Sequence, residues 1–447
     1  MPTSGTDGHP SGFDIAIAGG VTIRTPANIR LMTPYILLEQ EDWFEEETGF
    51  LRSLIEPGET VIDIGANYGV YAASLAAAVG ETGRIVAIEP AASTARYLTA
   101  TLAGFPQAVT VQAALGEVEG DAILTTADNS ETNRLVDATE DNGASETVAL
   151  RRFDDIAADF GVADPGFIKL DAEGAELRIL TGAVTLMREA DPLIMFERKH
   201  GPSINTDLIN GFEALGFGIF QLLPGPGILA PYDPNRTDAF GLNLFAAKPG
   251  RAEKLADAGR LVTAWPDAAD KSASEAAETV AWLLEQATAL AAAAEDSPDG
   301  ATALAALLAF ARVSRGLGLR RPAIDALGRA LMMLQSGEKG VDPTALPPDP
   351  DFDETPPDQR DLSWLTAATI TAYERARNYS SYFTDQSTLP LLDRLRETPH
   401  AVPEMLRRRQ LMQVRNGQRQ SLEWEAGFDA ETQRNPTIWR GEINLGL

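Results

Sequence analysis

The chain has 447 residues, and 65 Asp and Glu against 37 Lys and Arg give it a net charge of −28. This excess of negative charge argues against a nucleic-acid substrate, because a phosphate backbone requires a basic surface. It also argues against electrostatic docking on an anionic membrane. Cysteine is absent, which excludes disulfides, thiolate catalysis and cysteine metal sites. Three histidines, His9, His200 and His400, are too few for a multi-histidine metal site.

The start of the chain and its apolar runs bear on the compartment. The first 25 residues lack the basic region and apolar core of a signal peptide. No uncharged apolar run reaches the length of a membrane span. We therefore expect a cytoplasmic protein with no membrane insertion, long enough for two or three domains.

Residues 1–25 are expected to be a disordered N-terminus, since Pro, Ser, Thr and Gly dominate the first twelve. Residues 35–55 then show helical spacing that stops at Pro57-Gly58. From there, short apolar strands alternate with helices, which predicts a parallel sheet. Strands are expected at 60–64, 84–88, 108–113, 166–170 and 193–197, helices at 69–79, 91–103, 153–160, 174–188 and 204–215, and further strands at 121–126, 146–150, 217–223 and 241–247.

The periodicity changes at Pro249-Gly250, after which Ala-, Leu- and Glu-rich helices replace the strands. Two of these helices, at 302–316 and 320–336, form a hairpin similar to one tetratricopeptide repeat, although a single unit is a weak signal. Such helices offer a surface for a protein partner. The expected parts are a disordered segment at 1–25, an α/β domain at 26–250, a helical region at 251–340, a Pro-rich acidic linker at 341–360 and a C-terminal helical region at 361–447.

The stretch 59–69 is the most informative part of the chain. A short apolar run ends in Asp63 and turns through Gly65 and Gly69 into an alanine-rich helix, and a second apolar run ends in Glu89. This order builds a nucleoside pocket at the carboxyl edge of two parallel strands. The glycines let the backbone approach the ligand, and the acid at the second strand tip receives ribose hydroxyls.

The glycine spacing discriminates between ligands. A dinucleotide fingerprint would place glycines at 65, 67 and 70, but Asn67 and Val70 stand at two of these positions. The pattern Asp-x-Gly-x-x-x-Gly resembles the first motif of class I methyltransferases that bind S-adenosylmethionine (SAM), whose ammonium group suits a carboxylate. Binding of NAD or a nucleotide sugar is the disfavoured alternative. The predicted cofactor-binding residues are Asp63, Gly65, Ala66, Asn67, Tyr68, Gly69 and Glu89.

A second block, at 167–182, contains Lys-x-Asp-x-Glu-Gly-x-Glu, and an apolar strand ending in Glu197 follows it. Together with the first motif, this block resembles the FkbM family of methyltransferases over roughly residues 30–248. The resemblance implies a Rossmann-like class I methyltransferase fold, mostly parallel with an antiparallel edge strand, here followed by an all-α C-terminal region. It also implies SAM-dependent O-methylation of a sugar or polyketide hydroxyl.

Four acidic residues, Asp63, Glu89, Asp171 and Glu197, end predicted strands. Because ligands bind outside the carboxyl ends of parallel strands, these side chains should converge on one cleft. Lys169 lies inside an apolar run, where a lysine is usually paired or reaches toward solvent. A structural ion pair with a nearby carboxylate and a role in orienting the substrate are both open.

Methyl transfer to a hydroxyl requires a base. Asp171 is the first candidate because it lies at the tip of the central strand, and His200 is the second because imidazole titrates near neutral pH. Glu173 and Glu176 share a helix face if the helix has begun at Glu173, and with Glu197 they are candidates to contact substrate or metal. A divalent cation held by Asp171, Glu173 and Glu197 is not favoured, since carboxylates also prefer helix starts.

Two classes of function follow from these residues. The first is an O-methyltransferase that uses SAM and a small-molecule or glycan acceptor, with Asp171, His200 and Lys169 as the catalytic candidates. The alternative is a non-catalytic SAM-binding protein whose helical region serves as a scaffold for partners.

Overall fold

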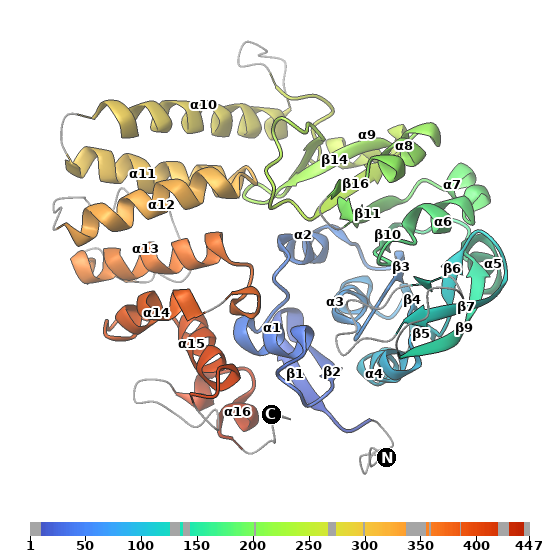
Figure 1. Ribbon diagram of the computed structural model, residues 1–447. Coiled ribbons are helices and arrows are strands. Elements are labelled where there is room, and N and C mark those ends of the chain that lie inside the picture. The colour runs from blue at the N-terminus through green and yellow to red at the C-terminus, as the bar shows by residue number, and fades with distance from the viewer. Residues whose placement is uncertain are drawn as a thin grey trace. The chain divides into compact units, whose positions relative to one another are not determined.

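The described residues form two compact units (Figure 1). The first unit holds residues 10–221 and 242–255, and the second holds 222–241 and 256–441. The computed structural model describes residues 10–125, 135–136, 144–200, 203–266, 274–297, 300–336, 355–356, 359–384, 386–418 and 429–441.

The segment expected to be disordered begins instead with a β-hairpin. Strands β1 (Phe13–Ile17) and β2 (Val21–Thr25) pair antiparallel. Phe13 and Ile15 on the inward face of β1 are fully buried, because alternate residues of a strand point to one face. The prediction of disorder is therefore wrong for residues 10–25, since the hydrophobic alternation outweighs the polar start of the segment. Residues 1–9 lie outside the described residues.

The helical stretch expected at 35–55 is two helices, α1 (Met32–Gln40) and α2 (Glu46–Leu54). The break falls at Glu41, whose φ of 56° is left-handed and ends α1. The break matters for the site described below, because it places Glu45 at the N-cap of α2.

The main sheet has eight strands in the order β15-β14-β16-β11-β10-β3-β4-β5. Strands β5, β4, β3, β10 and β11 are parallel, and β16 runs antiparallel to β11 and β14. The expectation of a mostly parallel sheet with antiparallel pairing near one edge is confirmed. The strands are β3 (Thr60–Ile64), β4 (Arg84–Ile88), β5 (Ala108–Val111), β10 (Phe167–Leu170), β11 (Leu193–Glu197), β14 (Gly218–Leu223), β15 (Ile228–Pro231) and β16 (Asn243–Ala247).

Helices follow the parallel strands along the chain. The single helix expected at 174–188 is interrupted at Gly182, the C-cap of α6, where an added Cβ would be 2.0 Å from the carbonyl oxygen of Gly116. The helices of this part are α3 (Val70–Val79), α4 (Ala92–Leu102), α5 (Phe153–Asp159), α6 (Glu176–Thr181), α7 (Val184–Glu189), α8 (Thr206–Ala214) and α9 (Pro249–Asp257).

Two smaller sheets accompany the main one. The order in the four-stranded sheet is β6-β9-β7-β8, in which β6 and β9 are parallel. Strands β12 and β13 pair antiparallel. Their bounds are β6 (Ala114–Gly116), β7 (Gly120–Thr125), β8 (Leu135–Val136), β9 (Ser145–Arg152), β12 (Lys199–His200) and β13 (Ser203–Ile204).

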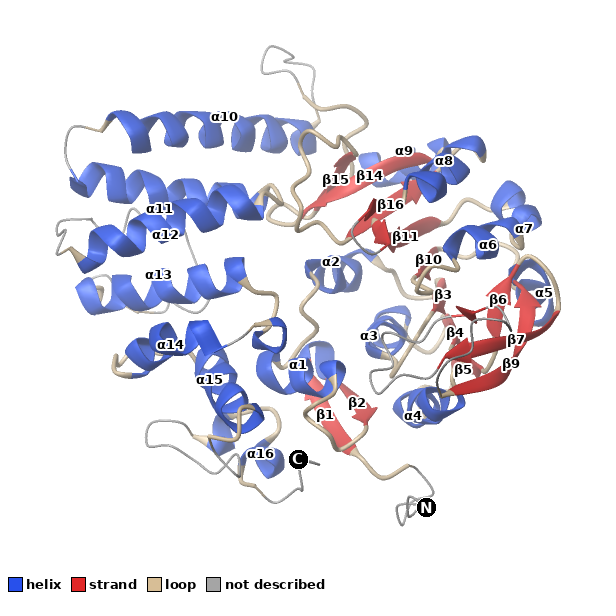
Figure 2. Ribbon diagram, viewed as in Figure 1, coloured by secondary structure: helices blue, strands red, loops and turns tan. Residues whose placement is uncertain are grey.

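The second unit is helical over its described residues from 274 onward (Figure 2). Helices α10 to α13 pack side by side in sequence order. Much of the expected linker at 341–360 lies outside the described residues. None of the described helices is long and apolar enough to cross a membrane. The helices are α10 (Glu275–Asp296), α11 (Gly300–Gly316), α12 (Arg320–Gln335), α13 (Leu362–Arg377), α14 (Leu389–Arg396), α15 (Pro403–Arg415) and α16 (Pro436–Trp439).

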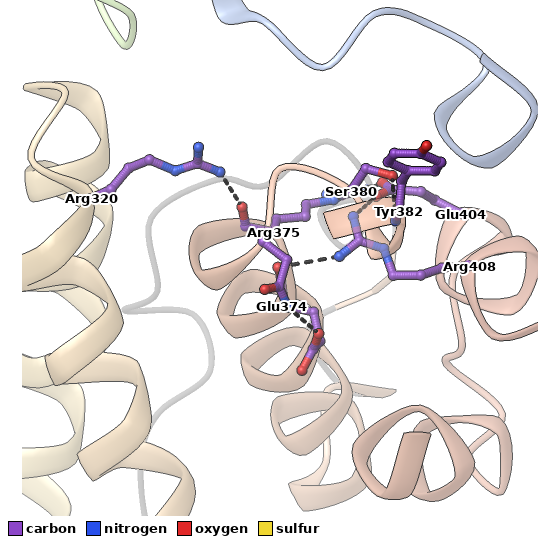
Figure 3. A network of polar contacts seen from close by, with 8 residues as sticks. Arg320, Glu374, Arg375, Ser380, Tyr382, Glu404 and Arg408 are labelled. Atoms are coloured by element: carbon purple, nitrogen blue, oxygen red, sulfur yellow. Dashed lines mark hydrogen bonds and ion pairs between the residues drawn. The ribbon is translucent and has the colours of Figure 1, made fainter. Parts of the chain in front are cut away.

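A network of arginines and carboxylates joins α13 to α15 in the second unit (Figure 3). Two nitrogens of the Arg375 guanidinium donate to Glu404 Oε2, at 2.6 and 2.8 Å. Arg408, 1% exposed, donates to Glu404 Oε1 at 3.4 Å and to the Glu374 carbonyl at 3.3 Å. Arg320, on α12, donates to the carbonyl of Arg375 at 2.6 Å. The charges buried here are thus matched by partners of opposite sign or by backbone oxygens.

Candidate functional site

The loop after β3 is fixed by the ends of two neighbouring strands. The amides of Gly65 and Ala66 both donate to the carbonyl of Ile88, each at 3.0 Å. Gly65 has a φ of 74°, and an added Cβ there would lie 1.7 Å from the Asp171 carbonyl oxygen. Close packing on the backbone after β10 therefore requires this glycine. Gly69 caps α3, and an added Cβ would meet Leu98 at 2.8 Å.

Asp63 lies in β3 with no exposed surface. Burial raises its pKa to about 6, although the positive charge of Lys169 opposes the shift. The Ala72 amide also lowers this pKa, but neither carboxylate oxygen has a partner of standard hydrogen-bond geometry among the described residues. Because a buried carboxylate is costly without donors, Asp63 suits a ligand that brings an ammonium or hydroxyl group.

Glu89 links the loop after β3 to the turn after β4. One carboxylate oxygen accepts from the Asn67 amide at 3.1 Å, and the other accepts from the Ala91 amide at 2.9 Å. Burial nevertheless raises the pKa of Glu89 to about 7. Each oxygen keeps a further lone pair, so Glu89 can hold the loop and also accept from a ligand hydroxyl.

Two of the predicted cofactor residues have apolar surroundings. Ala66 and Tyr68 are both 5% exposed. The Tyr68 ring packs edge-on against Tyr97, with ring centroids 5.8 Å apart. Asn67 is half-buried and has a left-handed φ of 49°. The loop thus presents backbone and Asn67 at its bend, while Tyr68 packs toward α4.

Lys169 and Asp171 form an ion pair at the carboxyl end of β10, with Nζ 2.8 Å from Oδ2. Lys169 is also the register partner of Asp63 on β3. Burial lowers the pKa of Lys169, but the charges of Asp171 and Asp63 outweigh it and raise the pKa above its usual range. The lysine is therefore charged, and the Asp171 side chain, 38% exposed, is held at the strand tip.

Three carboxylates meet beside this ion pair. Asp171, Glu176 and Glu197 each offer an oxygen within 4.8 Å of the others. The oxygen Oε1 of Glu176 already accepts from the amides of Ala172 and Gly174, at 2.9 and 3.1 Å. Glu176 thus takes the place expected for Glu173, which is exposed on the same turn. The group has the oxygen donors that a divalent cation prefers.

Glu197, at the end of β11, is the most perturbed member of this group. Burial raises its pKa to about 8, and the negative charges of Asp171, Glu173 and Glu176 add to the shift. Glu197 is therefore mostly protonated at neutral pH, so that it can donate a hydrogen bond.

The second base candidate, His200, lies on the short strand β12, where it pairs with Ser203. The backbone of this residue is described, but its side chain lies outside the described part of the structure. A catalytic role for His200 stays a prediction.

Sequence reasoning missed Glu45, Glu47 and Tyr71. The Tyr71 hydroxyl donates to Glu45, and Lys169 Nζ lies 5.2 Å from the centroid of the Tyr71 ring. Burial raises the pKa of Glu45, and burial together with Glu45 raises the pKa of Glu47 to about 8. The only sequence signal was the run of three glutamates at 45–47, which is also typical of a helix start.

Residues 63–218 match the family model of the methyltransferase FkbM domain. This segment is an FkbM methyltransferase domain. The resemblance to the FkbM family and the class I methyltransferase fold are thereby confirmed. No curated protein matches the chain.

Solved structures of methyltransferases resemble a part of this chain that is shorter than half its length. The methyltransferase FkbM from Methylobacillus flagellatus KT is 22% identical, with a TM-score of 0.31 over 42% of this chain and 43% of that one. A SAM-dependent methyltransferase from Aquifex aeolicus is 14% identical, with a TM-score of 0.27 over 47% and 91%. A SAM-dependent O-methyltransferase from Thermotoga maritima is 17% identical, with a TM-score of 0.25 over 45% and 64%. The chain thus spans less than half of the FkbM structure.

The geometry of the FkbM domain fits SAM. The buried carboxylate of Asp63 lacks hydrogen-bond partners of standard geometry, and an ammonium group would supply them. Glu89 at the tip of β4 retains lone pairs for ribose hydroxyls.

Proposed function

We propose that the protein transfers the methyl group of SAM to a hydroxyl oxygen of a saccharide or a related natural product. The observation that carries this proposal is the Asp171 carboxylate, which is partly exposed and fixed by Lys169 at the end of β10. The backbone carbonyl of the same residue packs against Gly65 of the cofactor loop. A base at this position lies next to both the cofactor and the acceptor.

Asp171 has the chemical properties that proton removal requires. Its Oδ2 is engaged by Lys169, which leaves Oδ1 for the acceptor hydroxyl. Bound SAM supplies the electrophilic methyl group. As the acceptor oxygen bonds to the methyl carbon, the bond from that carbon to sulfur would break and leave S-adenosylhomocysteine, while the hydroxyl proton would pass to Asp171 and later to solvent. Lys169, which stays charged, holds this carboxylate in place before the reaction through their ion pair.

Glu197 favours an acceptor with several oxygens. Its pKa of about 8 makes it a hydrogen-bond donor at neutral pH, and Asp171 beside it is an acceptor. A donor and an acceptor within 4.8 Å of each other suit two neighbouring hydroxyls of a polyol, because each hydroxyl can both donate and accept.

The test is transfer of a labelled methyl group from SAM to a panel of saccharides and polyketide alcohols. In the variant Asp171→Asn, turnover should fall by ~10²–10⁴, the usual contribution of a general base, while SAM affinity barely changes. Glu189→Gln is the matched control, because it removes an exposed carboxylate of the same unit that lies outside this group. An active Asp171→Asn enzyme with an inactive His200→Gln enzyme would transfer the role to the histidine.

The alternative functions give different outcomes in the same experiments. SAM binding in calorimetry without methyl transfer to any acceptor would favour the non-catalytic scaffold. Binding of NAD in place of SAM would contradict the cofactor assignment. Loss of activity with a chelator and recovery with magnesium would instead make Asp171, Glu176 and Glu197 metal ligands.

A further inference from the structure

Lys169 depends on more than its carboxylate partner. The residue is 6% exposed within β10, and a buried ammonium is costly unless it is surrounded by compensating groups. Three carboxylates, those of Asp63, Asp171 and Glu45, act on its charge. Only one of them, Asp171, has a recorded hydrogen bond to Nζ. A further contact is therefore expected to hold the Lys169 ammonium in position beside Asp171.

Tyr71 provides a surface for this ammonium. The residue lies in the first turn of α3, directly after the cofactor loop, and is 5% exposed. Its ring centroid is 5.2 Å from Nζ of Lys169, within the range of a cation–π contact. A desolvated contact of this kind is stronger than an exposed one. The tyrosine ring thus fixes the lysine from the side of α3.

Glu45 strengthens and orients that contact. As the N-cap residue of α2, it accepts a hydrogen bond from the Tyr71 hydroxyl. This bond polarises the O–H group of the phenol and shifts electron density toward the ring, whose negative face attracts the ammonium. It also locks the rotation of the tyrosine side chain. The contacts therefore run from Glu45 through Tyr71 and Lys169 to Asp171.

We propose that Glu45 and Tyr71 are positioning residues for methyl transfer, which hold Lys169 so that it presents the Asp171 carboxylate to the acceptor. This inference rests on the proposed role of Asp171 as base. Because turnover is sensitive to displacements of about 1 Å in the reacting groups, loosening Lys169 should lower kcat more than it changes substrate binding.

Kinetics of the full-length protein test the proposal. Tyr71→Phe keeps the ring but loses the bond to Glu45, and kcat should fall about 10-fold, whereas Tyr71→Leu also loses the ring and should cost about 100-fold. The SAM dissociation constant should stay within about twofold. Glu45→Gln can still accept from Tyr71 and should retain more activity than Glu45→Ala. Tyr71→Phe combined with Glu45→Ala should be no worse than the worse single variant, because both act through one bond.

The matched control is Tyr379→Phe, which removes a hydroxyl that donates to the carbonyl of Phe240 in the second unit and should leave kcat unchanged. A readout that needs no turnover is the ammonium signal of Lys169. The chain has only six lysines, so lysine-selective isotope labelling can resolve it. Its proton exchange should be slow in the wild type and faster in Tyr71→Phe.

The outcomes separate this inference from the proposed function. Unchanged kcat and unchanged ammonium exchange in Tyr71→Phe would overturn the positioning role, whatever Asp171 does. An equal loss of kcat and SAM affinity would also overturn it, since that pattern indicates general damage to the domain. An active Asp171→Asn enzyme would contradict the base assignment, while faster exchange in Tyr71→Phe would still support the hold on Lys169.

Discussion

The two units of the chain both bury carboxylates, but they compensate the negative charge differently. In the FkbM domain, burial raises the pKa of Asp63 to about 6 and that of Glu197 to about 8, and the negative charge of Asp171 adds to both shifts. In the helical unit, burial would raise the pKa of Glu404 as well, but Arg375 and Arg408 outweigh it and lower the pKa. Neighbouring cations thus outweigh the effect of burial at Glu404 in the helical unit, whereas burial outweighs the nearby cation at Asp63 in the FkbM domain.

This difference separates stability from function. A carboxylate whose pKa is lowered in the folded state stabilises that state when it is ionised. A carboxylate whose pKa is raised destabilises it, and such groups persist where a ligand or a reaction uses them. We therefore infer that the Glu404 network holds the helices together, whereas the carboxylates at the strand tips serve the cofactor and the acceptor.

The largest expected effect is on the helical network. Glu404→Ala leaves the buried Arg408 and the partly buried Arg375 without this carboxylate, which should lower the free energy of unfolding by about 3–5 kcal/mol. Urea unfolding followed by circular dichroism measures the loss. Because the folded pKa of Glu404 is lowered, its contribution is present above its ordinary pKa of 4.5 and is lost as pH falls through the folded value. SAM affinity should not change.

A compensating substitution sharpens this first prediction. Replacing Glu404 by Leu and Arg375 by Met together removes both charges of the closest pair, and it should recover part of the lost stability. A loss below about 1 kcal/mol in Glu404→Ala would contradict the network's structural role, because that is the range of exposed ion pairs.

Asp63→Asn should raise the free energy of unfolding instead of lowering it. Because burial raises the pKa of Asp63 from 3.8 to about 6, ionisation costs the folded state roughly 3 kcal/mol. The cost is absent below about pH 4 and fully present above about pH 6. The Asn variant should therefore be more stable near pH 8, by at most this amount, and should lose SAM binding by about 2–4 kcal/mol. Calorimetry with SAM and urea unfolding at pH 4 and pH 8 measure both effects.

Asp14→Asn is the control for this variant, since Asp14 is 61% exposed on β1 in the same unit. It should change neither stability nor SAM affinity appreciably. If Asp63→Asn binds SAM as tightly as the wild type, the assignment of the pocket is wrong.

Glu89→Gln should have an intermediate effect, which falls on SAM affinity. The side-chain amide keeps one oxygen to accept from the backbone, but it replaces the other oxygen by a donor opposite the amide of Asn67 or Ala91. Together with a weaker bond to ribose, this should reduce SAM affinity by about 2 kcal/mol, or about 30-fold. The comparison is the same titration with S-methylmethionine, a ligand that lacks the ribose and the adenine of SAM. If the affinity for that compound falls as much as the affinity for SAM, Glu89 does not contact the ribose.

The strand tips could be predicted from the sequence, because apolar runs and acids follow the chain locally. The bounds 60–64 and 84–88 agree with β3 and β4. The hairpin at 13–25 also carried a local signal, an alternation of apolar and polar residues around Gly19 and Gly20, which the polar composition of the preceding residues obscured. The predicted bounds are thus most accurate for strands whose apolar spacing is not obscured by neighbouring residues of another composition.

The contacts that complete the site could not be predicted in this way. Glu45 reaches Tyr71 across 26 residues, and no periodicity links a helix cap to the first turn of another helix. The close approach at Gly182, where the helix is interrupted, involves the carbonyl of Gly116 in a distant strand. The sequence suggested that Gly65 is needed so that the backbone can approach a ligand. The structure shows that the backbone carbonyl of Asp171 also leaves no room for a side chain there. Each of these features depends on tertiary contacts.

The smallest expected effect comes from a second arginine–carboxylate pair of the helical unit. Arg409 Nε lies 2.6 Å from Asp393 Oδ1, a distance equal to that of the closest contact between Arg375 and Glu404. The Asp393 side chain, however, is 52% exposed, whereas that of Glu404 is 16% exposed. Asp393→Asn should therefore cost at most about 1 kcal/mol of unfolding free energy, since water screens the pair and solvates the arginine that remains.

Salt provides the deciding measurement for this pair. The small effect of Asp393→Asn should shrink further in 1 M NaCl, where exposed charges are screened over about 3 Å, while most of the effect of Glu404→Ala should persist because Arg408 is buried. Gln413 also accepts from Arg409 at 3.2 Å, so the guanidinium keeps a partner in the variant. A loss as large as that of Glu404→Ala would mean that burial of the arginine alone, and not of the whole pair, determines which charges stabilise the helical unit.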